Sequence, residues 1–306
     1  MKTAGLIGLG IMGSAMAANL MKAGYQVIGF DVLAARRRAH ARAGGIAVGS
    51  AGEVAQRAGM VICSLPSAAA LAATAAALAG EGSRRRRARI VVEASTLPIE
   101  AKQAARRRLA AAGLTLLDCP VSGTGAQARD KDIVIYASGP RAACRRAAPV
   151  MEGFARAHYY VGPFGAGSKM KFVANLLVAI HNVAAAEALV LAMKAGLDPA
   201  LTLHVIADGA GSSRMLQVRG SMMVRGEYAN ATMKLGVWQK DMALIAAFAR
   251  KVGSRTPLFT ATAPLYKAAM ALRGDAADTG AVCAVLEEMA GVRRRPRRLT
   301  PRGRRR

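Results

Sequence analysis

The chain has 306 residues, of which 53% are hydrophobic and 20% are charged, so it can hold two domains and is too apolar to be a disordered chain. Its formal net charge of +26 would ordinarily indicate a polyanionic partner. Most of the excess lies in arginine clusters at residues 36–38, 84–89, 106–108 and 293–306. We interpret these clusters as a solvated basic surface, with nucleic-acid binding as the alternative.

The four cysteines and four histidines show none of the spacings of a metal site. We therefore expect no bound metal, and we expect the cysteines to be reduced packing residues. The first residues lead directly into an apolar strand pattern, without the three-part pattern of an export signal. The expected compartment is the cytoplasm.

Residues 3–8 predict a buried strand that leads into a glycine turn and a helix over 12–23, and a second strand over 26–31 ends on Asp31. This order suits a dinucleotide fold. The glycines let the backbone approach the pyrophosphate, the helix N-terminus faces its charge, and the acid accepts hydrogen bonds from ribose hydroxyls. The residues expected to form the turn are Gly8, Gly10, Ile11, Met12 and Gly13.

Further strands are predicted at the spacing of βαβ units, over residues 60–64, 90–94, 114–119, 133–138 and 157–161. Such alternation predicts an α/β fold with a mostly parallel, doubly wound sheet, whose ligands gather at the carboxyl ends of the strands. Those ends carry Leu65, Pro66, Ser95 and Thr96.

The loop CPVSGTG, over residues 119–125, also follows a predicted strand. Its serine hydroxyl and glycine amides could hold a carboxylate, with a simple turn as the alternative. The residues concerned are Ser122 and Gly123.

One long helix is predicted over residues 165–195. It is apolar enough to suggest a membrane span, but its asparagines, histidine and glutamate would be costly in lipid, so we expect it to be buried in protein. Lys171, Asn175 and Asn182 share one stripe of the helix. A lysine in an apolar cleft can act as an acid or base, whereas a lysine at a helix start can also simply reach solvent.

After this helix the strand patterns stop, and helices are expected from Asp198 to residue 292, including 238–252 and 257–272. We thus expect three parts. Residues 1–164 form the dinucleotide-binding domain, residues 165–292 form an all-α domain for substrate binding and dimerisation that begins with the long interdomain helix, and residues 293–306 form a disordered basic tail.

With these stretches assembled, the chain resembles the β-hydroxyacid dehydrogenase family, the group of 3-hydroxyisobutyrate dehydrogenase and tartronate semialdehyde reductase. The resemblance covers about residues 3–292. It rests on four motifs in order: GLIGLGIMG at 5–13, DCPVSGTG at 118–125, GAGSKMKFVAN at 165–175 and KDMALIA at 240–246.

The resemblance implies that Lys171 is the catalytic lysine and that Asn175 orients the substrate one turn later. It also implies that Ser122 and Gly123 bind the substrate, that Thr96 contacts the nicotinamide ribose, and that Lys240 reaches the cofactor, accompanied by Asp241. The expected function is hydride transfer between NAD, or alternatively NADP, and a small hydroxy acid or semialdehyde that carries a carboxylate. Asp31 favours NAD, and the arginines at 36–38 oppose that preference.

Two positions depart from the family pattern. Thr124 follows Ser122 and Gly123 where glycine or serine is common, and Met233 stands where several relatives have an aromatic residue. Both positions are expected in the substrate pocket, so the sequence does not identify the substrate. The chain has no Tyr-x-x-x-Lys motif. Alternatives are an imine reductase, which has another residue type in place of the lysine, and a non-catalytic binding protein.

A homodimer or homotetramer is expected, because so long an aliphatic helix needs partners.

Overall fold

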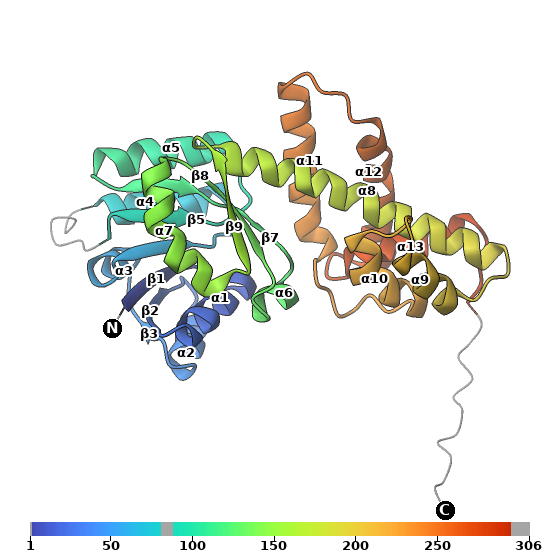
Figure 1. Ribbon diagram of the computed structural model, residues 1–306, viewed down its shortest axis with the longest axis horizontal. Coiled ribbons are helices and arrows are strands. Elements are labelled where there is room, and N and C mark those ends of the chain that lie inside the picture. The colour runs from blue at the N-terminus through green and yellow to red at the C-terminus, as the bar shows by residue number, and fades with distance from the viewer. Residues whose placement is uncertain (1, 81–87, 295–306) are drawn as a thin grey trace, which may run out of the picture. The chain divides into compact units, whose positions relative to one another are not determined.

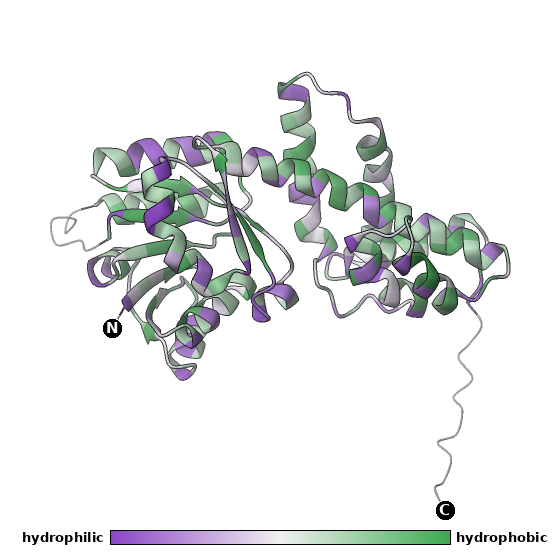
Figure 2. Ribbon diagram, in the orientation of Figure 1, coloured by the Kyte–Doolittle hydropathy of each residue, from purple (hydrophilic) through white to green (hydrophobic). Residues whose placement is uncertain are grey.

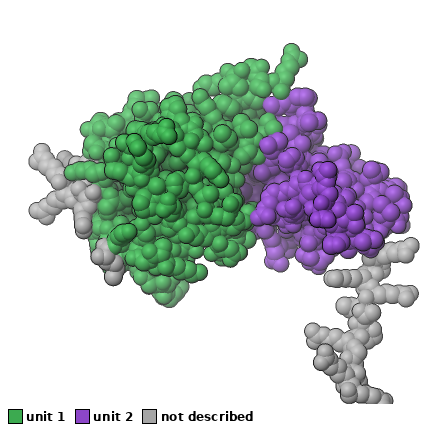
Figure 3. Space-filling view, viewed as in Figure 1, with its two compact units in different colours: residues 1–176, 241–255 green, residues 177–240, 256–306 purple. Residues whose placement is uncertain are grey.

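The computed structural model describes residues 2–80 and 88–294. The chain forms two compact units (Figure 3): unit 1 holds residues 1–176 and 241–255, and unit 2 holds residues 177–240 and the chain from 256 onward. The division lies about one third of the way along the long helix, not at the expected boundary after residue 164. The reason is that the first turns of that helix pack on the sheet of unit 1.

A single sheet organises unit 1 (Figure 1), with the strand order β3-β2-β1-β4-β5-β6-β8-β7 and with β9 paired to β8. The strands are β1 (Lys2–Ile7), β2 (Tyr25–Phe30), β3 (Ile46–Ala47), β4 (Met60–Cys63), β5 (Ile90–Glu93), β6 (Thr115–Asp118), β7 (Val121–Ser122), β8 (Val134–Ser138) and β9 (Ala157–Gly162). The first six strands in this order are parallel. The chain therefore has the expected doubly wound sheet, and its strand order reverses between β1 and β4, which is where such folds bind their ligands.

The far end of the sheet is antiparallel, a feature that the sequence pattern did not predict. Strand β8 runs antiparallel to both β6 and β7 and parallel to β9. The connection from β6 to β8 contains the short strand β7, which pairs antiparallel with β8, so the chain returns along the sheet edge as a hairpin and not through a parallel crossover.

Helices cover both faces of the sheet (Figure 1). They are α1 (Ile11–Lys22), α2 (Ala34–Arg42), α3 (Ala51–Arg57), α4 (Ala68–Ala79), α5 (Ile99–Ala111), α6 (Gly125–Arg129) and α7 (Arg141–Phe154). One apolar core joins α1, α6 and α7 to the sheet, and a second joins α3, α4 and α5 to the opposite face. Strand residues that are apolar on both faces explain the two cores.

The four cysteines are free and buried, as expected. Burial raises the pKa of each thiol, so these side chains behave as small apolar groups in the packing.

The long helix, α8 (Ala166–Lys194), is within one residue of its expected bounds at each end. By length and composition it could cross a membrane, but 44% of its most apolar window is buried inside the protein. Figure 2 shows that apolar residues dominate its length. Its buried residues include Lys171 and Asn182, which would be costly in lipid.

The described residues of unit 2 form helices joined by loops, with one isolated β-bridge between Lys234 and Asp278. Unit 2 contains the second part of α8, the first turns of α11 (Leu235–Lys251), and the elements α9 (Pro199–Asp208), α10 (Arg214–Arg225), α12 (Pro257–Arg273), η2 (Thr279–Ala281) and α13 (Val282–Met289). Asp198 caps α9 by accepting a hydrogen bond from the backbone N–H of Leu201, as its sequence predicts.

Asn182 is a packing residue of unit 2. Its side-chain amide donates to the hydroxyl of Tyr266 at 3.1 Å and to the carbonyl of Thr279 at 2.9 Å. The shared stripe with Lys171 and Asn175 is therefore no sign of a shared site, because the helix passes from one unit into the other between Asn175 and Asn182.

The packed chain extends to Arg294, two residues past the expected end of the all-α domain at residue 292. Arg294 pairs with the carboxylate of Glu287 and donates to the carbonyls of Met223 and Val224. The rest of the predicted tail, residues 295–306, lies outside the described residues.

Candidate functional site

The glycine turn after β1 has the close approaches that a dinucleotide cradle requires. Gly8 has φ +90°, and a Cβ added there would lie 2.1 Å from the carbonyl oxygen of Ser64. A Cβ on Gly13 would lie 1.8 Å from the carbonyl oxygen of Gly8. Glycine is therefore sterically required at both positions. Gly10 caps α1 without a side-chain hydrogen bond, so the first N–H groups of that helix remain for an anionic group, and the residues fit a pyrophosphate.

Asp31 stands at the end of β2 beside this turn. Its Oδ2 accepts a hydrogen bond from the N–H of Leu9 at 2.8 Å, and its Oδ1 accepts one from the N–H of Leu33 at 2.9 Å. The guanidinium of Arg36 lies 3.3 Å from Oδ2. Arg36 also faces Gly10, because a Cβ there would lie 3.7 Å from its Nη1. An acid and a cation thus share the place where an adenosine ribose would lie.

In addition to the backbone pairing, a side-chain hydrogen bond joins the ends of β4 and β5. The N–H of Leu65 donates to the hydroxyl of Ser95 at 2.7 Å. Pro66 is exposed next to Leu65, and Thr96 is half-buried next to Ser95. The structure therefore brings these predicted residues to one edge of the sheet.

The loop with Ser122 and Gly123 lies close to the glycine turn. Gly123 has φ +134°, and a Cβ on Gly125 would lie 2.4 Å from the side chain of Ile11. Thr124 begins α6 with a capping box that it forms with Gln127. The departure from the family pattern at Thr124 thus has a local explanation: its hydroxyl caps a helix.

The first turn of α8 is fixed on the sheet through Asp118, the last residue of β6. The N–H of Ser168 donates to Asp118 Oδ2 at 2.8 Å, and the Ser168 hydroxyl donates to Oδ1 at 2.8 Å. A Cβ on Gly167 would lie 2.5 Å from the carbonyl oxygens of Asp118 and Tyr136 and 3.0 Å from Pro120. Only glycine permits this approach, and it places the helix beside the loop that leads to Ser122.

Lys171 follows one turn later and is buried, with 7% of its surface exposed. Asn175 is 4% exposed and donates from Nδ2 to Asp241 Oδ2 at 3.0 Å. Asp241 lies in α11 and is also buried, so a buried polar contact joins α8 and α11 at this point. Lys240, directly before Asp241, is half-buried and belongs to unit 2.

Sequence reasoning missed three polar residues around this site: Lys102, Asp118 and Ser168. Asp118 directly precedes the CPVSGTG loop and Ser168 lies inside the glycine-rich motif, so their positions were a usable signal. Lys102 offered none, because it stands in a helix rich in charged residues.

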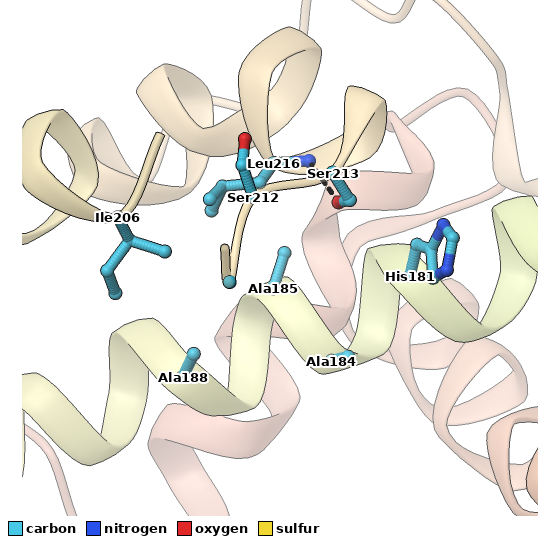
Figure 4. Close-up of a pocket in the computed structure, with 9 residues that line it drawn as sticks. His181, Ala184, Ala185, Ala188, Ile206, Ser212, Ser213 and Leu216 are labelled. Atoms are coloured by element: carbon cyan, nitrogen blue, oxygen red, sulfur yellow. Dashed lines mark hydrogen bonds between the residues drawn. The ribbon is translucent and has the colours of Figure 1, made fainter. Parts of the chain in front are cut away.

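A separate cavity of about 260 Å³ lies wholly in unit 2 (Figure 4). Four residues of α8, from His181 to Ala188, line it opposite Ile206 and the turn that begins α10. Ser213 is occupied there as the cap of α10, accepting a hydrogen bond from the N–H of Leu216 at 3.1 Å. The cavity contains none of the predicted site residues. Across residues 2–80 and 88–294, no group of three or more His, Cys, Asp or Glu side chains is placed to hold a metal ion.

A dinucleotide cradle with a buried lysine near the same sheet edge defines a class, the nicotinamide-dependent oxidoreductases. Comparison with known proteins narrows the class. Residues 3–162 match the model described as the NAD binding domain of 6-phosphogluconate dehydrogenase, and residues 165–286 match that of the NAD-binding of NADP-dependent 3-hydroxyisobutyrate dehydrogenase. The chain belongs to the β-hydroxyacid dehydrogenase family, and it is an NAD(P)-dependent oxidoreductase that acts on CH–OH groups.

The similarity to individual relatives extends over nearly the whole chain. An L-threonate dehydrogenase from Cupriavidus necator is 32% identical, over 91% of this chain and 94% of the relative. A 3-hydroxyisobutyrate dehydrogenase from Pseudomonas aeruginosa is 33% identical, over 82% of this chain and 87% of the relative. The crystal structure of a 3-hydroxyisobutyrate dehydrogenase from Salmonella typhimurium has a TM-score of 0.81 at 28% identity, covering 93% of this chain and all of that one.

Imine reductases are more distant. The enzyme from Streptomyces aurantiacus has a TM-score of 0.58 at 22% identity, over 93% of this chain and 99% of its own, and this likeness shows a related fold alone.

Proposed function

We propose that the protein transfers hydride between NAD(P) and a small β-hydroxy acid or its semialdehyde, with Lys171 as the proton donor and acceptor. The observation that carries this proposal is the burial of Lys171 one turn before Asn175, which is itself bound to Asp241. When bound, the nicotinamide supplies or accepts the hydride.

Lys171 would take the hydroxyl proton in the oxidation and return it to the carbonyl oxygen in the reduction. The substrate oxygen gains negative charge in that transition state. An ammonium group held in an apolar site stabilises such charge far more than water does, because it needs no reorganisation during the step.

Ser122 and Gly123 would bind the substrate carboxylate. A hydroxyl and a backbone N–H in a loop with positive φ can both donate to a carboxylate oxygen. Asn175 would orient the substrate with its amide, whose rotation is restricted by the hydrogen bond to Asp241. This arrangement requires a substrate that has its carboxylate close to its hydroxyl group.

NAD is proposed as the preferred cofactor, because Asp31 would face the 2′-phosphate of NADP. Two unit charges about 4 Å apart repel by roughly 4 kcal/mol at an effective dielectric constant of about 20. Arg36 opposes this preference, since its guanidinium lies beside the same carboxylate.

We also propose a homodimer or homotetramer. Exposed apolar side chains follow one side of α8 at alternating spacings of three and four residues, including Met170 (41% exposed), Val173 (53%) and Leu177 (47%). This spacing is typical of helices that pack against another helix. A second copy of the chain would cover the stripe.

The test is a substrate screen that follows the absorbance of the reduced nicotinamide with both cofactors. The panel contains the acids that name the relatives, L-threonate, 3-hydroxyisobutyrate, 2-hydroxy-3-oxopropionate and L-serine, together with cyclic imines. Turnover of at least one acid, and of no imine at a comparable kcat/KM, is the expected result. Turnover of imines alone would contradict the proposal.

A further inference from the structure

A buried ionic cluster lies beneath the candidate site in unit 1. Lys102, Glu93 and Asp118 have no exposed surface. The ammonium of Lys102 lies 2.6 Å from Glu93 Oε2, and it donates to Asp118 Oδ1 at 2.8 Å and to the carbonyl of Ser95 at 2.6 Å. The ammonium therefore contacts three oxygen atoms: it donates hydrogen bonds to Asp118 and Ser95 and forms an ion pair with Glu93.

This cluster holds two carboxylates and one ammonium. Burial alone would lower the pKa of Lys102, but Glu93 and Asp118 outweigh burial and hold that pKa above its ordinary value. Lys102 is therefore charged at neutral pH. Without it, two carboxylates would remain buried side by side with no counterion. Well-packed apolar residues often stabilise a core as well as a buried ion cluster does, so fold stability alone gives no reason for this one.

Two segments of the candidate site meet at the cluster. On one side, Asp118 binds both the N–H and the hydroxyl of Ser168, three residues before Lys171. On the other side, the backbone of Ser95 makes two contacts with the cluster. Its carbonyl accepts a hydrogen bond from Lys102, and the Ser95 N–H donates to Glu93 Oε1 at 3.0 Å. Ser95 directly precedes Thr96. Lys102 contacts both Asp118, which holds the first turn of α8, and the carbonyl of Ser95.

We propose that Lys102 is a positioning residue that holds the first turn of α8, and through it Lys171, in register with the loop that carries Thr96. The inference rests on the proposed roles of Lys171 and Thr96, and Lys102 itself touches neither substrate nor cofactor. Its contribution is orientation: a misplacement of about 1 Å between reacting groups can slow an enzyme by about 10²-fold.

The test substitutes Lys102→Met, which keeps the unbranched apolar stem and removes the ammonium. Hydrogen exchange of the cofactor-free protein should show faster exchange over residues 165–172, because Asp118, which accepts hydrogen bonds from the N–H and the hydroxyl of Ser168, loses the cation that fixes its carboxylate. In the same protein kcat should fall by at least about tenfold, while KM for the cofactor changes less than about threefold. Ser168→Ala, which removes one of the two bonds to Asp118, should change both readouts in the same direction by less.

The matched control is Lys251→Met. Lys251 forms an ion pair at 2.5 Å with Glu100, and Glu100 lies on α5, the helix that carries Lys102. Both partners of this pair are exposed. This variant should leave exchange over 165–172 and kcat unchanged. If Lys102→Met does not fold, the double variant Lys102→Met with Glu93→Gln keeps the net charge of the cluster at its native value and takes its place.

Unchanged kcat in Lys102→Met, with or without a loss of thermal stability, would overturn the positioning role. Unchanged exchange over 165–172 would overturn it as well. Lys171→Met, measured alongside, separates the two claims: turnover that survives in that variant contradicts the proposed role of Lys171, whereas the exchange experiment needs neither substrate nor cofactor.

Discussion

At the scale of single residues, the most informative side chains are those whose neighbours change what their chemistry can do. Asp31 and Arg36 are one such pair. The carboxylate is buried with 4% of its surface exposed, and its two oxygens already accept hydrogen bonds from Leu9 and Leu33. Arg36 reaches the same carboxylate from a half-exposed position and can turn to another anion at little cost.

Cofactor choice should therefore respond to Arg36. We expect Arg36→Ala to raise the ratio of kcat/KM for NAD over NADP by about tenfold, because it removes the cation that compensates Asp31, an effect on the order of 1 to 2 kcal/mol at a partly exposed site. Arg38, which is exposed on the same helix, provides the control as Arg38→Ala. A ratio that stays within twofold of the wild type would show that Arg36 takes no part in cofactor choice.

His40 should make the fold sensitive to mild acid. Burial lowers its pKa from the ordinary value of 6.5, and the hydrogen bond with the carbonyl of Val27 only partly opposes this. The unfolded chain then binds a proton more readily than the folded chain does. The stability contributed by neutral His40 is complete above about pH 6.5 and is lost as the pH falls toward the folded-state value.

The measurement is the free energy of unfolding in urea between pH 7.5 and pH 5. His40→Leu should flatten this pH dependence, whereas His204→Gln, at an exposed position, should not. An equally steep dependence in His40→Leu would assign the acid sensitivity to other groups.

At the scale of elements, the sequence predicted most of what local chemistry determines. Two local signals were enough to predict the glycine turn, Asp31 and the bounds of α8. These signals are the close backbone approaches that only glycine permits and the periodicity of apolar residues. The contacts of Lys102 with Glu93 and Asp118 join three elements, so no local pattern in the sequence could predict them. Asn182 lies on the predicted stripe with Lys171 and Asn175, but it packs within unit 2, which helical periodicity alone could not predict.

Helix α8 also carries the proposed subunit contact. We expect the wild-type protein to be a dimer or tetramer by light scattering after size-exclusion chromatography. Val173→Glu with Leu177→Glu should shift it toward monomer, because two charges would be buried without partners. Leu201→Glu, at an equally exposed leucine of α9, is the control. A wild-type monomer would contradict the proposal.

At the scale of the whole molecule, the net charge of +26 is compatible with an enzyme that binds a small acid. The proposed site uses only a few of the lysine and arginine side chains, and the others need no role in catalysis. The basic C-terminal segment can be tested by two truncations. One ends at Arg294 and the other at Val292.

Hydride transfer in the chain that ends at Arg294 should stay close to the full-length rate. The chain that ends at Val292 should be less stable by about 1 to 3 kcal/mol, because buried Glu287 loses its cation and the carbonyls of Met223 and Val224 each lose one donor. Chemical denaturation of both truncations measures this difference. Equal stability of the two truncations would show that Arg294 contributes nothing to the fold. A tenfold lower rate of hydride transfer in the chain that ends at Arg294 would show that the residues after Arg294 are needed for activity.

The central claim is that Lys171 transfers the proton, and the most direct measurement is kcat of Lys171→Met together with its affinity for NAD. Methionine keeps the length and the apolar stem, so the helix should still pack. Removal of the ammonium eliminates both the proton donor and the stabilising cation, and kcat should fall by about 10² to 10⁴-fold. NAD affinity should stay within about threefold of the wild type, since the glycine turn that fits the pyrophosphate is unchanged. A variant that keeps more than a tenth of the wild-type kcat would contradict the account.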